Sequence, residues 1–266
     1  MNRLSLDKRA KIIQLIVEGN SLRSCSRIAD VSITTVSKLL VDVGRACLKF
    51  HSQTAIRIRC KRVQCDEIWS FVYCKDKNVV DEKYGIGSVW TWVAIDADSK
   101  FVISWFAGER TLEAATFFMN DLWCRLRTRV QLTTDGYKGY QEAVADTFGR
   151  NVDFAQLVKQ YNEREHYIGA RRIPIAGKPD KKYITTSHVE RQNLTMRMCI
   201  RRFGRKTNAF SKKMDNHCYA IALHFVHYNF CRIHTSLRVT PAMQIKVAEK
   251  PMTYKDIALL VEKYLK

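Results

Sequence analysis

Three carboxylates in this sequence stand where a folded chain could bring them together. Asp66 lies in the apolar run RVQCDEIWSFVY, Asp135 ends RVQLTTDG just before the glycine, and Glu190 opens a later segment, SHVERQNLTMRM. Carboxylates that cluster repel one another and stay ionised together only around a cation. Oxygen ligands of this kind favour Mg²⁺ or Mn²⁺, and two such ions about 3.5–4 Å apart catalyse phosphoryl transfer. Taken singly, they fit an exposed strand position, a turn and a helix cap.

Glu190 is followed by a strongly basic segment. From Arg191 to Lys206 the chain has six lysine or arginine residues and no acid. Ser187 and Glu190 also fit the S-x-x-E capping box, in which both side chains satisfy amides of the first helical turn. On a helix that starts here, Asn193 and Arg197 share the face of Glu190. The candidates for DNA contact are therefore Asn193, Arg197, Arg201, Arg202, Arg205 and Lys206, and the alternative is a solvated basic face.

The composition indicates a globular and strongly basic protein. Of 266 residues, 46% are hydrophobic, and 45 basic against 26 acidic residues give a net charge of +19. This excess favours nucleic acid as the partner over an anionic membrane. The nine cysteines are scattered without a C-x-x-C pair, which argues against a disulfide framework or a zinc ribbon. With no apolar run long enough for a membrane span, we expect a cytoplasmic, nucleoid-associated protein.

Residues 1–48 have the pattern of a small helical DNA-binding domain. Apolar residues recur at helical spacing in three segments; Gly19 can end the first, and Ser21 and Ser32 can cap the second and third. Two short helices joined by a tight turn form a helix-turn-helix. The outward residues at the end of the third helix that enters the major groove are Thr34, Thr35 and Lys38. An ordinary three-helix bundle is the alternative.

The rest of the sequence predicts the sheet that must position the carboxylates. Residues 49–61 read as a basic linker, after which the hydrophobic period changes to that of strands. The order of elements is β-β-β-α-β-α-β-α, with a long polar loop expected over residues 162–186. This order predicts a mixed α/β fold over residues 62–245, with a five-stranded mixed sheet flanked by helices. Residues 246–266 are expected to form a C-terminal helix.

Four motifs resemble one known family. CDEIWSFV, TTDGYKGY, SHVERQNLTMRMCIRRFGRKTNAFSKK and YNFCRIHTSLRVTPAM are similar to segments of the DDE transposases of the insertion-sequence-1 family. The resemblance covers roughly residues 5–245. It implies an RNase H-like catalytic core with Asp66, Asp135 and Glu190 as the catalytic and metal-binding triad, and a preceding helix-turn-helix that binds the element's ends.

The function that this resemblance implies is metal-dependent DNA transposition. The chain would bind the terminal inverted repeats of an insertion sequence as a homo-oligomer, cut the strand with Mg²⁺ or Mn²⁺, two ions being expected, and transfer the 3′ hydroxyl to target DNA. Two alternatives stay open: a catalytically inactive, sequence-specific DNA-binding regulator, and a non-mobile nuclease with an RNase H fold.

Other polar residues read as structural. Glu67 should face away from Asp66, because neighbours on a regular strand alternate sides. Asp96 and Asp98 fit a hairpin turn. The histidines of the helix near residues 211–229 lack a second pair of ligands for zinc, so we expect them in the core or in an interface.

Overall fold

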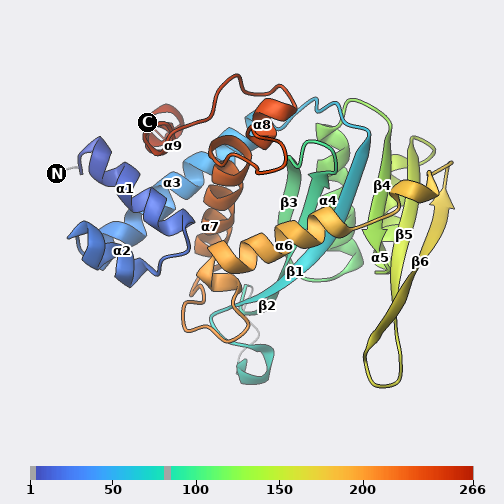
Figure 1. Ribbon diagram of the computed structural model, residues 1–266. Helices are drawn as coiled ribbons and strands as arrows, with labels where there is room; N and C mark the ends of the chain where they lie inside the picture. The colour runs from blue at the N-terminus through green and yellow to red at the C-terminus, as the bar shows by residue number, and fades with distance from the viewer. Residues whose placement is uncertain (1–3, 81–84, 266) are drawn as a thin grey trace. The chain divides into compact units, whose positions relative to one another are not determined.

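The computed structural model describes residues 4–80 and 85–265 (Figure 1). Its helices are α1 (Leu6–Val17), α2 (Leu22–Ala29), α3 (Ile33–Thr54), α4 (Leu112–Arg125), α5 (Gly139–Phe148), α6 (Ser187–Cys199), α7 (Met214–Val226), α8 (Pro241–Gln244) and α9 (Tyr254–Leu265). Its strands are β1 (Arg62–Val72), β2 (Gly87–Asp96), β3 (Val102–Gly108), β4 (Val130–Asp135), β5 (Val152–Tyr161) and β6 (Tyr167–Ala176). The prediction of a mixed α/β fold is confirmed.

The strands form one mixed sheet in the order β3-β2-β1-β4-β5-β6. β2 and β3 are antiparallel, β4 is parallel to both β1 and β5, and β6 returns antiparallel to β5. The order of the first five strands is that of an RNase H-like sheet. Helical crossovers, α4 between β3 and β4 and α5 between β4 and β5, allow the parallel pairings at the centre.

The sheet has six strands where the sequence predicts five. The sixth, β6, lies in the segment expected to be a polar loop, and it pairs with β5 from Phe154–Ala176 to Tyr161–Tyr167. Figure 1 shows the two strands as a long hairpin at the edge of the sheet. Every residue of β6 is exposed or half-buried. Its strand is therefore held by backbone pairing rather than by an apolar face, and hydrophobic periodicity gives no sign of it.

Helices α4 and α5 pack together and cover the side of the sheet drawn at the back in Figure 1. The fully buried Trp92 of β2 anchors this layer, with ring centroids 5.9 Å from Phe118 of α4 and 5.4 Å from Tyr140 of α5. Thr111 caps α4 by accepting a hydrogen bond from the amide of Ala114. This aromatic layer supports the central strands β1 and β4, which carry Asp66 and Asp135.

The chain forms two compact units. One comprises Met1–Thr54, Trp69–Val89 and Leu194–Lys266, and will be called the helical unit; the other comprises Ala55–Ile68 and Trp90–Asn193, and will be called the sheet unit. β1, β2 and α6 each contribute residues to both. These boundaries differ from the division expected from the sequence, in which residues 1–48 stand apart from residues 62–245.

In the helical unit, α2 and α3 are joined by a turn of three residues, as the sequence predicts. Ser21 and Ser32 cap the two helices by accepting hydrogen bonds from the amides of Ser24 and Thr35. α3 continues to Thr54, so the first six residues of the predicted linker are helical. The helix extends because its apolar stripe continues: Phe50 packs on Phe230 with a centroid distance of 4.8 Å. α3 also packs against α7 and α9.

The histidines of α7 and the following turn lie in the core, as expected. His217 and His224 of α7, and His227 just after it, are each less than 10% exposed. His217 lies between the hydroxyls of Ser70 and Ser211, at 3.1 and 3.2 Å. Among the described residues, no helix combines the length and apolarity that crossing a bilayer would require.

Candidate active site

Two parallel strands and one helix bring the three predicted carboxylates to a single pocket. Asp66 of β1 and Asp135 of β4 each directly follow the last paired residues of the two strands, Cys65 and Thr134. Glu190 comes from the first turns of α6, within the sheet unit. All three line an open pocket of about 590 Å³, together with Lys138, Lys159, the turn between β4 and α5, and the outer half of β5.

The tightest group of carboxylates includes Glu67, against the expectation that it faces away. One carboxylate oxygen from each of Asp66, Glu67 and Asp135 lies within 4.8 Å of the others. Strand alternation sets the side of the sheet to which the Cβ atom of Glu67 points, but its side chain is long enough for hydrogen bonds to set the position of its carboxylate. The hydroxyl of Tyr140 and Nε of Arg110 donate to the Glu67 carboxylate at 2.9 and 2.6 Å. Glu190 lines the same pocket but is not part of this close group of described residues.

Two cations partly neutralise the carboxylates. Arg110 pairs with Glu67 at 2.6 Å and reaches Asp135 at 3.6 Å, and its guanidinium lies over the ring of Tyr137. Lys159 of β5 pairs with Glu190 at 2.9 Å. Four carboxylates thus share two paired cations, so the group carries excess negative charge when every carboxylate is ionised.

The pKa values reflect this excess. Burial, followed by the charges of Glu67, Asp135 and Glu190, raises the pKa of Asp66 to about 7. Burial and the charge of Asp135 raise the pKa of Glu67 to about 7 despite the opposing effect of Arg110, and burial raises the pKa of Asp135. The site therefore ionises fully only at a free-energy cost, which a bound cation would relieve.

The start of α6 is held by a side chain of β1, and Ser187, which the sequence suggested as its cap, is the first residue of the helix. The amides of His188 and Val189 donate to Oε1 of Gln64, a buried residue of β1, at 2.8 and 3.2 Å. The hydroxyl of Thr186 donates to Glu190 at 2.5 Å. Since Gln64 satisfies amides of the first turn, the Glu190 carboxylate points into the pocket and pairs with Lys159.

Asn193 lies in the carboxylate site. The sequence suggested it as a DNA contact, but it is only 7% exposed, and its Nδ2 donates to Oδ2 of Asp66 at 2.9 Å. Its Oδ1 is buried without a hydrogen-bond partner among the described residues. Asn193 thus orients Asp66 and leaves an uncommitted oxygen beside it.

The donor set fits a divalent cation. Asp66, Asp135 and Glu190 offer hard oxygen ligands from three different elements, and Mg²⁺ and Mn²⁺ prefer such ligands. Asp66 accepts a hydrogen bond from the neutral amide of Asn193, and its pKa is raised. The unpartnered Oδ1 of Asn193 is a further sign that a positively polarised group belongs here.

The other predicted DNA-binding residues belong to the helical unit. Thr34 and Lys38 are exposed on α3, whereas Thr35 is half-buried and shares a hydrogen bond with the Ser32 hydroxyl. Arg197 donates to the carbonyl of Phe203 at 2.9 Å, Arg201 donates to the carbonyl of Gly19, and Arg202 is half-buried. Arg205 and Lys206 are exposed.

Sequence reasoning missed the cations of the site. Leu157 pairs with Asp135 in the register of β4 and β5, and Lys159 lies two residues further along, on the same face. With the strand pairing known, alternation would have placed Lys159 near Asp135. For Arg110, which follows β3 in the segment GER, the sequence carries no comparable signal.

Comparison with known proteins gives distant structural likenesses. No protein-family model matches the chain, and no curated protein sequence matches it. A synaptic complex of piggyBac transposase with hairpin DNA matches with 10% identity and a TM-score of 0.49, over 100% of this chain and 74% of that one. A Mos1 transposase paired-end complex with the left transposon end matches with 16% identity and a TM-score of 0.26, over 58% and 60%. The Mos1 strand transfer complex matches with 15% identity and a TM-score of 0.27, over 84% and 76%.

Proposed function

We propose that this chain is a metal-dependent DNA transposase of a bacterial insertion sequence, with Asp66, Asp135 and Glu190 as its catalytic carboxylates. The observation that carries the proposal is the pocket in which two parallel strands and the start of a helix present three carboxylates. The net charge of +19 supports a polyanionic substrate such as DNA.

Asp66, Asp135 and Glu190 would hold two Mg²⁺ or Mn²⁺ ions, which when bound activate an attacking oxygen and stabilise a leaving oxygen at phosphorus. The chain's own residues position these ligands: Asn193 holds Asp66, and Thr186 and Lys159 hold Glu190. Lys138 is exposed at the pocket and can bind a non-bridging oxygen of the DNA backbone.

Two in-line displacements at phosphorus would follow on this site. In the first, water attacks the phosphodiester at an element end, and the 3′ oxygen leaves as a hydroxyl. In the second, this 3′ hydroxyl attacks a phosphodiester of the target, so one bond forms as another breaks and no protein–DNA bond is made. Residues Thr34, Thr35 and Lys38 would recognise the ends, the basic residues from Arg197 to Lys206 would bind backbone phosphates, and the chain would act as a homo-oligomer.

The test is strand cleavage by the full-length chain. The substrate is a supercoiled plasmid carrying the DNA that flanks the gene, incubated with Mg²⁺ or Mn²⁺. We expect nicks at the element ends that leave 3′ hydroxyls, and their loss in Asp66→Asn and Glu190→Gln with DNA binding retained. The exposed Asp146→Asn on α5 is the matched control and should cleave like the wild type.

Two results would replace the proposal with one of its alternatives. Cleavage of branched DNA irrespective of the flanking sequence would indicate a nuclease with an RNase H fold. Tight binding of the flanking DNA without cleavage by either metal would indicate a DNA-binding regulator.

A further inference from the structure

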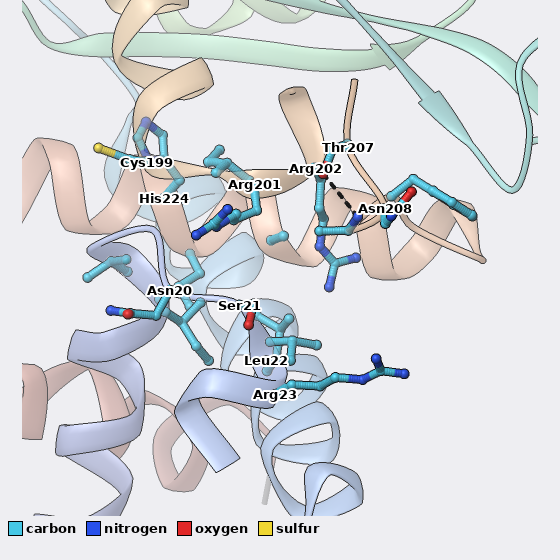
Figure 2. A pocket seen from close by; sticks show the side chains of 18 of the residues that line it. Asn20, Ser21, Leu22, Arg23, Cys199, Arg201, Arg202, Thr207, Asn208 and His224 are labelled. Carbon is cyan, nitrogen blue, oxygen red and sulfur yellow. Dashed lines mark hydrogen bonds between the residues drawn. The ribbon is translucent and has the colours of Figure 1, made fainter. Parts of the chain in front are cut away.

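A second pocket, of about 670 Å³, lies within the helical unit. Figure 2 shows the residues that line it: Asn20, Ser21, Leu22 and Arg23 come from the turn before α2 and from its first residues. Cys199, Arg201, Arg202, Thr207 and Asn208 come from the end of α6 and the segment that follows, and His224 comes from α7. The pocket thus joins the start of α2 to the basic segment that follows α6.

The charge around this pocket has one sign. Arg23, Arg201, Arg202 and Lys212 line it, and none of its described lining residues is an aspartate or a glutamate. The first turn of α2 contributes as well, because the amides at a helix N-terminus carry partial positive charge. Ser21 caps this turn, accepting from the amide of Ser24 at 3.0 Å. The pocket therefore suits an anionic ligand.

Arg202 is the strongest sign of such a ligand. Its Nη1 donates to the hydroxyl of Ser211 at 2.7 Å and to the carbonyl of Asn216 at 3.1 Å, and both acceptors are neutral. Burial lowers the pKa of Arg202 to about 10. A partly desolvated guanidinium without a carboxylate partner is costly, and a phosphate matches its donor geometry. Two hydrogen bonds to neutral groups therefore fix the guanidinium of Arg202 at the pocket, where an anion could pair with it.

The remaining wall of the pocket is apolar. Ile16 and Val17 of α1, Leu40 of α3 and Leu223 of α7 line it. A volume of about 670 Å³ lies within the usual range for small-molecule sites. A cationic side and an apolar side together fit a nucleotide, whose phosphate and base need these two environments.

We propose that this pocket holds one nucleotide of a DNA strand, with its phosphate at Arg202 and its sugar and base against the apolar wall. The inference rests on the proposed function for the identity of the ligand as DNA. It adds to that function a second contact with DNA, at the start of α2, which is separate from the contacts proposed for Thr34, Thr35 and Lys38 on α3.

Alkylation of Cys199 measures occupancy directly. Cys199 is half-buried and lines the pocket, whereas Cys124 of α4 is exposed and serves as the internal control. The full-length chain is treated with iodoacetamide, and each cysteine is followed by peptide mass spectrometry. At a concentration about ten times its Kd, a 20-nucleotide single-stranded DNA should slow alkylation of Cys199 about tenfold, because only about a tenth of the chain stays free. Millimolar deoxycytidine monophosphate should protect partially, and inorganic phosphate only weakly.

Charge variants identify the contacts. Arg23→Ala and Lys212→Ala remove exposed side chains, so the fold should be kept, which circular dichroism verifies. Each should abolish most of the protection and lower the slope of log Kd against log salt concentration by about 1. The exposed Lys250→Ala should leave protection and slope unchanged.

Several outcomes overturn the inference. Full alkylation of Cys199 in the presence of bound DNA would show that DNA does not occupy the pocket. Protection by inorganic phosphate equal to that by the 20-nucleotide DNA would show that the pocket binds simple anions and not a nucleotide. Metal-dependent nicking with Cys199 unprotected would refute the pocket and leave the transposase proposal intact. Protection of Cys199 in a wild-type chain that never nicks DNA would support the pocket and refute the transposase proposal.

Discussion

Asp66 is repelled by three neighbouring carboxylates, those of Glu67, Asp135 and Glu190. Its carboxylate lies close to those of Glu67 and Asp135, and its pKa is raised to about 7. Enzymes commonly hold such clusters at a cost to stability, because the charges serve the reaction rather than the fold.

Replacing Asp66 should therefore stabilise the metal-free protein. For Asp66→Asn at pH 8 we expect a gain of about 1 kcal/mol, or roughly 2–4 °C in Tm, since one repelling charge is removed. Mn²⁺ at a hundred times its Kd should stabilise the wild type by about 2.7 kcal/mol and so raise its Tm. The same variant should lose this stabilisation by Mn²⁺. Differential scanning calorimetry with and without Mn²⁺ measures both effects, with Asp146→Asn as control. A drop in metal-free Tm would show that Asp66 contributes to stability rather than to metal binding.

Asn193 should act through Asp66. Asn193→Ala removes the amide that orients the carboxylate, and the loss of such a supporting hydrogen bond lowers metal affinity about 10–100-fold. We expect the Mn²⁺ concentration for half-maximal cleavage to rise by this factor, with DNA affinity nearly unchanged. The exposed Asn151→Ala is the control. If DNA affinity falls instead, the side chain contacts DNA, as the sequence first suggested.

At the scale of elements, the position of Glu190 depends on how α6 begins. Gln64 of β1 accepts from two amides of the first turn, and Thr186 bonds to Glu190 itself. The sheet therefore fixes the end of the helix that carries the third carboxylate.

Gln64→Leu should loosen this end. The substitution keeps an apolar stem but leaves two buried amides unsatisfied, which costs about 1–3 kcal/mol. Hydrogen exchange should speed up at His188 and Val189, and cleavage should fall, while the amides of α4 keep their protection. The exposed Gln160→Leu on β5 provides the comparison. Unchanged exchange at α6 would mean that packing alone holds the helix.

The elements also show what the sequence can and cannot predict. The sequence suggested that Asp66 and Asp135 converge because Asp66 lies within one apolar run and Asp135 ends another, and the structure pairs these two strands in parallel. The sequence did not predict β6, because an exposed edge strand needs no apolar pattern. It also did not predict the last turns of α3, because the basic composition of residues 49–61 suggested a linker although the apolar stripe of the helix continues there. The approach of Glu67 to the cluster depends on Tyr140 and Arg110, which no local pattern connects to it.

At the scale of the whole molecule, buried histidines set the response to acid. Burial lowers the pKa of His217 to about 3, of His224 to about 3 and of His227 to about 4. Their unfolded pKa is about 6.5, so below that pH the unfolded chain binds protons that the native chain does not. Each histidine therefore lowers the free energy of unfolding as the pH falls from about 6.5.

The single variant His217→Gln isolates one of these contributions. Between pH 6 and pH 5, the dependence of unfolding free energy on pH should be weaker than in the wild type by about 1 kcal/mol per pH unit. Urea unfolding followed by circular dichroism gives this slope, and His166→Gln, at an exposed site, is the control. Comparing variant with wild type cancels the opposite contribution of Asp66 and Glu67, whose raised pKa values favour the native state as pH falls. A slope equal to that of the wild type would show that His217 is protonated in the folded chain.

The way the helical unit is assembled also sets an order of events during synthesis. Among its first three helices, α1 and α3 pack against α9 at the end of the chain: Arg9 pairs with Glu262 at 2.9 Å, and Phe50 packs on Tyr264. The sheet unit ends at Asn193, so its residues are all made before residues 194–266 emerge. At 5–20 residues per second, that interval lasts roughly 4–15 s. During this interval, the apolar face of α3 lacks its packing partners α7 and α9, which are not yet synthesised. A nascent chain that stops at residue 193 contains the whole sheet unit but only part of the helical unit.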